Sequence, residues 1–203
     1  MIADMAFDLE AVLQRLAVPR VHLVAHSMGG KTACYWAALY PSSVERMVII
    51  DVSPGANPES VSTIELMELI DTITLNHSGV QSPTQADVYL QPLIRNARLR
   101  QFMVDSISFQ PDKPPHWTFD AKNLRSNMHH IMTFEPPRGL GAFPRPVKFL
   151  KGSRSPYLRP EDHGAIMSEL FPQHSIVMVD GATHWMHYEQ PHRVISEAAS
   201  FLG

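Results

Sequence analysis

The sequence predicts an α/β fold, in which a parallel sheet is flanked by helices and interrupted by a helical insertion. Short apolar runs rich in β-branched residues alternate with helical patterns, as buried strands of a parallel sheet do. These runs lie at residues 21–25, 44–51, 147–151 and 175–179. A serine stands at the sharp turn between the first run and the helix that follows it. A long, proline-rich stretch separates the second run from the third.

The chain is expected to begin on an amphipathic helix. From Ile2 to Leu16 the apolar residues follow helical spacing, and the acidic residues lie mostly on the other face. Pro19 marks the break before the first strand. The segment contains three acids and is not rich in arginine, so it does not have the pattern of a transit peptide. We therefore expect Met1 to lead directly into a structural helix.

Residues 21–30, VHLVAHSMGG, predict a nucleophile elbow, a tight strand-to-helix turn that exposes a serine Oγ. Ala25 and Gly29, two residues before and after Ser27, are small enough to let the strand and helix approach closely. The helix N-terminus directs free N–H groups and its positive dipole end toward an oxyanion, with Met28 as the expected donor. The alternative is that Ser27 only caps the helix, a common position for serine.

Asp51, directly after the second strand, is the favoured acid because functional groups gather at the carboxyl ends of parallel strands. Many enzymes with such an elbow carry their acid after the next strand, but residues 152–157 contain no carboxylate. Glu161 and Asp162 fall in a first helical turn, where acids complement the helix dipole. Asp120 in the insertion is the reserve candidate. Asp51 could also be a loop acid before a turn proline.

His184 is the expected base. It follows the last strand and precedes the final helix, which begins at Pro191. The chain order serine, acid, histidine is the one that α/β-hydrolases use. The ordinary pKa of histidine lies near neutrality, so the side chain can accept and return a proton. The alternatives are a loop histidine bonded to the backbone and a competing His187, which we expect at the rim of the cleft.

We assign residues 1–54 and 144–203 to the hydrolase core and residues 55–143 to a helical cap over the site. Its helical patterns cover 61–75, 88–97 and 99–108, and prolines break it into short pieces. Large apolar side chains of the cap could line an acyl pocket or pack the cap's own core. They are Met67, Met103, Phe109, Trp117, Phe119, Met128, Met132 and Phe134.

The composition narrows the classes of partner. The 203 residues are 44% hydrophobic and 18% charged, and a net charge of −3 gives no footprint for nucleic acid or an anionic membrane. No apolar stretch approaches the about 18 residues of a membrane span.

A single cysteine, Cys34, excludes an intrachain disulfide and favours a reducing compartment. His116, His129 and His130 lack metal-ligand spacing, so neither a metal nor another cofactor is expected. The oligomeric state cannot be deduced.

Four blocks carry a family resemblance: residues 26–33 (HSMGGKTA), 50–54 (IDVSP), Gly152 with 155–157 (SPY), and 181–187 (GATHWMH). Together they resemble the α/β-hydrolase domain-containing protein 11 family and small bacterial esterases of the same type. The resemblance implies a serine esterase that acts on lipid-like or acyl esters, in animals a mitochondrial one. It also implies a triad of Ser27, Asp51 and His184.

We further assign His26 and Trp185, which adjoin the serine and the histidine, to substrate binding. Two residues depart from the family pattern. Ala25 replaces the first glycine of the serine motif, and Thr183 stands where the family usually has glycine, which narrows the freedom of the histidine loop.

Hydrolases of this type begin with several strands and a His-Gly loop whose N–H completes the oxyanion hole, and no such segment precedes the elbow. We therefore expect a chain truncated at its N-terminus, with the Met28 N–H as the sole oxyanion donor and the elbow strand at the sheet edge. Two functions follow. One is a serine hydrolase of carboxylic esters. The other is a truncated, non-catalytic isoform or incomplete gene model that acts as a binding or regulatory protein. The expected location is mitochondrial by resemblance and otherwise cytoplasmic.

Overall fold

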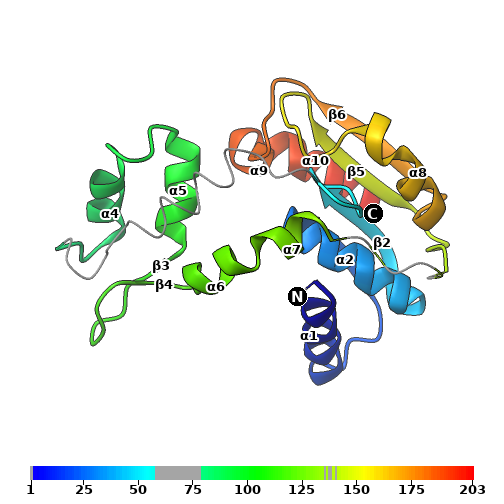
Figure 1. Ribbon diagram of the computed structural model, residues 1–203, viewed down its shortest axis with the longest axis horizontal. Coiled ribbons are helices and arrows are strands. Elements are labelled where there is room, and N and C mark those ends of the chain that lie inside the picture. The colour runs from blue at the N-terminus through cyan, green and yellow to red at the C-terminus, as the bar shows by residue number, and fades with distance from the viewer. Residues whose placement is uncertain (1, 58–78, 135, 137–138, 140) are drawn as a thin grey trace. The chain divides into compact units, whose positions relative to one another are not determined.

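A computed structural model of the chain describes residues 2–57, 79–134, 136, 139 and 141–203 (Figure 1). The chain divides into two compact units, residues 1–58 with 129–203 and residues 59–128. The second unit lies within the stretch 55–143 that was assigned to a cap, and its role as a cap stays a prediction. The helix expected at 61–75 lies outside the described residues.

The first unit contains a four-stranded parallel sheet, which confirms the predicted α/β class (Figure 1). The strands are β1 (Val21–His26), β2 (Val44–Ile50), β5 (Val147–Gly152) and β6 (His174–Val179), in the spatial order β1-β2-β5-β6. All three neighbouring pairs are parallel. The carboxyl ends of the strands therefore meet at one edge of the sheet, where Ser27, Asp51 and His184 follow three of them.

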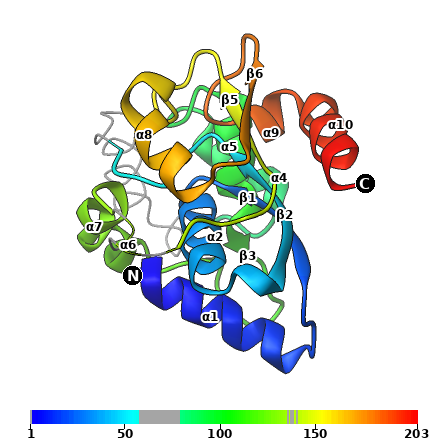
Figure 2. The ribbon, with the colours of Figure 1, turned by 90° about the vertical axis from the view of Figure 1, so that its right-hand side faces the viewer.

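Helices cover both faces of this sheet. Figure 2 shows α10 (Pro191–Leu202) on one side and α2 (Met28–Leu39) with α8 (Pro160–Leu170) on the other. The unit also contains α1 (Ile2–Arg15), the short α9 (Met186–Glu189) and most of α7 (Met128–Met132). The expected first helix is thus confirmed. One apolar core lies between α9, α10 and the sheet and consists of Val48, Ile50, Leu150, Val179, Ala182, Met186, Val194 and Ala198.

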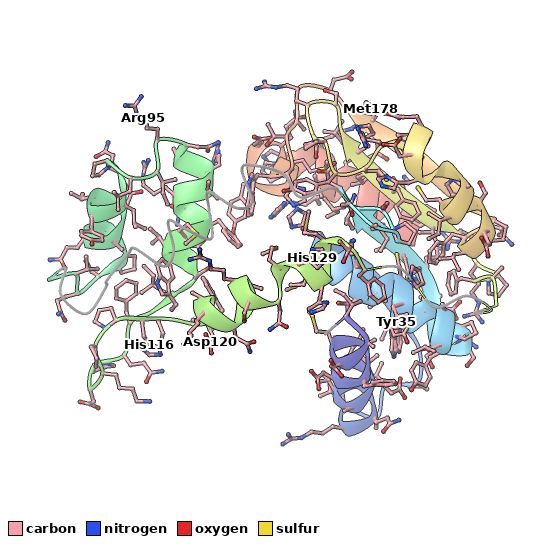
Figure 3. All side chains as sticks on the ribbon, in the orientation of Figure 1. Tyr35, Arg95, His116, Asp120, His129 and Met178 are labelled. Atoms are coloured by element: carbon pink, nitrogen blue, oxygen red, sulfur yellow. The ribbon has the colours of Figure 1, made fainter. Side chains whose placement is uncertain are left out.

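Among the described strands the elbow strand lies at an edge of the sheet, as expected, although its apolar run is typical of a strand buried on both faces. Side chains of β1 alternate between partly buried and exposed, and Val24 is 52% exposed. The reason is position, because among the described strands β1 pairs only with β2 and so lies at an edge. The opposite outer strand β6 also exposes an apolar side chain, Met178 (Figure 3).

The second unit has a core of its own. It contains α4 (Pro83–Leu90), α5 (Ala97–Asp105), α6 (Ala121–Ser126) and a small antiparallel ribbon of β3 (Ile107–Ser108) and β4 (His116–Trp117). Met103 is fully buried in this core, and Phe109, Trp117, Phe119 and Met128 pack against it. Of the two predicted roles, lining an acyl pocket or packing the cap's own core, the structure therefore supports core packing for these five side chains.

The helices predicted at 88–97 and 99–108 were misplaced, because polar caps rather than apolar spacing set their ends. Ser82 accepts a hydrogen bond from the Gln85 N–H and starts α4 before the predicted residue. Asn96 accepts bonds from the N–H groups of Arg98 and Leu99 and starts α5. None of the helices in the described part of the chain has the length and apolar character of a membrane span.

Lys31 on α2 is an unusual core residue, only 2% exposed. Its Nζ donates hydrogen bonds to the carbonyl oxygens of Ile131, at 3.2 Å, and Met132, at 3.3 Å. These carbonyls belong to the last turn of α7, where a cation satisfies unpaired acceptors. The backbone N–H of Asn57 donates to the same Met132 oxygen at 2.7 Å. The elbow helix is thereby fixed to the chain segments around Asn57 and α7.

Two adjacent glycines of the elbow provide a matched test of this packing. A Cβ on Gly30 would lie 2.6 Å from Val52 Cγ1 and 3.1 Å from Ile49 Cγ2, whereas a Cβ on Gly29 would meet nothing within 4 Å. We expect Gly30→Ala to lower the free energy of unfolding by about 1–3 kcal/mol through overpacking. Gly29→Ala should raise it by up to about 1 kcal/mol, as alanine favours helix. Denaturant unfolding measures both, and equal effects would contradict the close packing at Gly30.

Candidate active site

Ser27 occupies the predicted elbow between β1 and α2. Its backbone has φ 54° and ψ −124°, a left-handed φ that is uncommon outside glycine. Its N–H still donates to the Ile50 carbonyl of β2 at 3.1 Å. The side chain makes no cap bond to α2, so the helix-cap alternative fails. Instead the Oγ lies 2.9 Å from His184 Nε2.

His184 lies in the loop between β6 and α9 and connects Ser27 to Asp51. Its Nδ1 lies 2.8 Å from Asp51 Oδ2. Because an ionised carboxylate can only accept, Nδ1 carries the proton, which leaves Nε2 free to accept the Ser27 hydroxyl proton. Serine, histidine and aspartate thus form a continuous chain of two hydrogen bonds, drawn from the ends of β1, β6 and β2.

Asp51 is fully buried, and three donors surround its carboxylate. Oδ1 accepts the Gly152 N–H at 2.9 Å, and Oδ2 accepts the Ser155 hydroxyl in addition to His184. The end of β5 and the loop after it, where many such enzymes carry their acid, here supply two neutral donors to the acid that follows β2. Neither donor role was predicted, although both residues lie in a block that carries the family resemblance.

The other candidate acids are engaged elsewhere. Asp120 caps α6 by accepting the Asn123 N–H at 2.9 Å, and Figure 3 labels it on that helix. Glu161 and Asp162 lie in the first turn of α8, as predicted, and Asp162 forms an ion pair with Arg159. Of the acids weighed from the sequence, Asp51 is the one that contacts His184.

The loop that carries His184 is fixed by a second carboxylate. Glu189 accepts two bonds from Thr183, one from its N–H at 2.8 Å and one from its hydroxyl at 2.7 Å. Thr183 Oγ1 also accepts a hydrogen bond from the backbone N–H of Trp185, with 3.3 Å between nitrogen and oxygen. The residue expected to restrict this loop therefore does so through Glu189, which sequence analysis did not single out. Tyr157 packs its ring against His184 at a centroid distance of 4.2 Å.

Aromatic rings surround His184 on its other side. The ring of His26 lies 4.5 Å from His184, 4.3 Å from His187 and 5.9 Å from Trp185. Burial, aided by the neighbouring His184 and His187, lowers the pKa of His26 to about 3. Burial also lowers the pKa of His187. The substrate-binding roles of His26 and Trp185 stay predictions.

Met28 opens α2 directly after Ser27. Its N–H is one of the first four of the helix, which have no intrahelical acceptor. This N–H and the dipole of the 12-residue helix favour negative charge beside Ser27. Its role as oxyanion donor stays a prediction. Within the described residues, no group of three or more histidine, cysteine or acidic side chains could hold a metal ion.

Comparison with known proteins identifies the family. The family model described as the alpha/beta hydrolase fold matches residues 2–191. The chain belongs to this alpha/beta hydrolase family. It is 33% identical to the mouse (Mus musculus) sn-1-specific diacylglycerol lipase ABHD11, over 98% of this chain and 64% of that protein. It is 26% identical to Esterase YbfF of Escherichia coli strain K12, over 98% of this chain and 73% of that one.

Among solved structures, a marine microorganism esterase superposes with a TM-score of 0.87 at 26% identity. That match covers 98% of this chain and 77% of the esterase. The resemblance to the domain-containing protein 11 family is therefore confirmed, and the hydrolase relatives bear names of lipases and esterases. The chain spans less than two thirds of the mouse lipase, at 64%.

Gly152 allows a sharp test of how the histidine loop packs on the sheet. A Cβ there would lie 2.7 Å from the Thr183 carbonyl oxygen and 2.8 Å from that of Ala182. Since both atoms are backbone, Gly152→Ala should push the loop away and lower the midpoint of thermal unfolding by several degrees. Gly164→Ala on α8 is the matched control, because a Cβ there meets nothing within 4 Å. A Gly152 variant as stable as the Gly164 variant would contradict the close approach.

The lowered pKa of His26 predicts how stability depends on pH. The unfolded chain binds a proton at His26 near pH 6.5, while the folded protein does so only near pH 3. The free energy of unfolding should therefore fall as pH is lowered through this window, by up to about 1.4 kcal/mol per pH unit from this group. Urea titrations between these limits measure the slope. His26→Gln should flatten it, and His192→Gln, at an exposed helix position, should not. Equal slopes would contradict the neutral, buried His26.

Proposed function

We propose that this protein is a serine hydrolase that cleaves carboxylic esters of acyl or lipid-like substrates. The observation that carries the proposal is the unbroken hydrogen-bond chain from Ser27 Oγ through His184 to the buried Asp51. Such a chain activates a serine that is otherwise a weak nucleophile. The lipase and esterase names of the relatives favour an ester as the substrate.

In the proposed reaction, Ser27 Oγ attacks the ester carbonyl carbon while its proton passes to His184 Nε2. The carbonyl oxygen becomes an oxyanion that the Met28 N–H and the start of α2 stabilise. His184 returns the proton to the departing alcohol, which leaves an acyl group on Ser27. Water then attacks this acyl-enzyme with His184 again as base, and the acid is released.

Asp51 contributes by fixing one tautomer of His184 and by stabilising the imidazolium that forms in each half-reaction. Its burial strengthens this interaction, because a charge pair is screened less where one partner is withdrawn from water. Gly152 and Ser155 orient the carboxylate by donating one hydrogen bond to each of its oxygens. The negative charge of Asp51 is therefore held beside the ring of His184, where positive charge develops during the reaction.

The first test is labelling of the purified chain with a fluorescent fluorophosphonate probe. We expect labelling of the wild type and none of Ser27→Ala. Turnover of a soluble p-nitrophenyl ester should fall by about 10⁴-fold in Asp51→Asn, because the amide favours the wrong tautomer of His184. Asp180→Asn, at an exposed acid that also follows a strand, serves as control and should keep activity within about twofold.

Absence of labelling in folded wild-type protein would overturn the proposal and favour a non-catalytic binding or regulatory protein. Labelling that persists in Ser27→Ala would show that a residue other than Ser27 reacts with the probe. A mitochondrial location rests on family resemblance alone, and imaging of the tagged natural protein in cells tests it.

A further inference from the structure

The proposed reaction leaves the side chain of His26 without a role, although it adjoins the nucleophile. His26 is the last residue of β1, and its Nε2 lies 2.9 Å from the backbone carbonyl oxygen of His184. A carbonyl can only accept, so Nε2 carries a hydrogen and donates it. The bond joins residues 158 positions apart in the sequence.

The surroundings of His26 hold its ring in this orientation. The ring centroid of His26 lies 4.5 Å from that of His184 and 4.3 Å from that of His187. Burial keeps His26 neutral over the whole range in which a histidine base works, since its pKa is lowered to about 3. The Nε2–H donor follows from the bond to a carbonyl, and the neutral ring of His26 does not gain a charge that would repel an imidazolium on His184.

The topology explains why such a contact matters. The histidine loop leaves β6, whereas Ser27 follows β1, and β2 and β5 separate these two outer strands. The loop must therefore cross the carboxyl edge of the sheet to bring Nε2 to Ser27. Asp51 holds the ring of His184 from the end of β2, and Glu189 holds the neighbouring Thr183, but neither carboxylate bonds to the backbone of His184 itself. His26 holds that backbone from the residue next to the nucleophile.

We propose that His26 is a positioning residue, whose Nε2–H anchors the main chain of His184 to the nucleophile strand. The inference rests on the proposed function and deepens it. It also gives His26 a different task from the substrate binding predicted from sequence, because the Nε2–H bonded to His184 is not available to a substrate. A displacement of about 1 Å in a catalytic group can cost about 10²-fold in rate, so loss of the anchor should appear in turnover.

Two variants separate the donor from the ring. His26→Phe keeps an aromatic ring but removes the donor, and His26→Gln supplies an amide N–H at a comparable reach. With a soluble p-nitrophenyl ester, we expect His26→Phe to lower kcat by at least about tenfold and to change KM by less than about twofold. His26→Gln should recover kcat to within about threefold of the wild type.

His163 provides the matched control. It is a buried histidine whose Nε2 lies 2.9 Å from a distant backbone carbonyl, that of Ala56, and whose Nδ1 accepts the Arg159 N–H, so its two ring nitrogens bond groups outside the triad. We expect His163→Phe to lower the midpoint of thermal unfolding while kcat stays within about twofold of the wild type. An equal loss of kcat in both Phe variants would reduce His26 to a structural role and overturn the proposal. A rise in KM with unchanged kcat would overturn it in favour of substrate binding.

A measurement without turnover separates this proposal from the proposed function. The Nδ1 proton shared by His184 and Asp51 should give a downfield proton NMR signal in the wild type. We expect this signal to be lost in His26→Phe and retained in His26→Gln and His163→Phe. That pattern in a protein without esterase activity would support the anchor while rejecting the proposed function. A signal and a kcat that are both unchanged in His26→Phe would reject the anchor itself.

Discussion

The buried carboxylate of Asp51 is the constraint on which the rest of the first unit depends. An ionised group with no access to water is strongly destabilising unless hydrogen bonds replace its hydration. Three donors do so here, from Gly152, Ser155 and His184. Gly152 is the last residue of β5, Ser155 lies in the loop after β5, and His184 lies in the loop after β6. The folding requirement of one side chain therefore brings three strand ends together.

This requirement also limits what can stand around Asp51. Gly152 donates its N–H to the carboxylate and also lies close to the carbonyl oxygens of Ala182 and Thr183. A Cβ at this position would clash with both oxygens. The histidine loop in turn is fixed by Glu189 through Thr183. Gly152, Thr183 and Glu189 are not members of the triad. They nevertheless determine where His184 can be, and hence whether its ring reaches Ser27.

The sequence predicted the elements and the triad because their signals are local. Apolar β-branched runs mark the strands, and the small residues around Ser27 mark the elbow. Asp51 followed from its position directly after a strand, and His184 from its position in the loop between the last strand and the final helix. The contacts that orient them were not predictable in this way, since Ser155 lies 104 residues from Asp51 and His26 lies 158 residues from His184. A serine or histidine in a loop has many possible partners, and only the folded chain selects one.

The apolar run of β1 alone predicts a buried strand, and its expected position at the sheet edge explains why its side chains are partly exposed. The misplaced helices of the second unit have a different cause. There the boundaries depend on hydrogen bonds from Ser82 and Asn96, which apolar periodicity does not detect. Where a local polar group competes with a weak apolar pattern, the polar group determines the boundary.

Ser27 and Asp51 share a backbone property that links the sheet to the site. Both have left-handed φ angles, 54° and 53°, which cost about 1–3 kcal/mol each in residues other than glycine. Each nevertheless donates its N–H to a carbonyl of the neighbouring strand, Ser27 to Ile50 of β2 and Asp51 to Leu150 of β5. The parallel ladder thus continues for one residue after the strand has turned. Strand pairing offsets the strain, and the turn aims each side chain along the carboxyl edge toward His184.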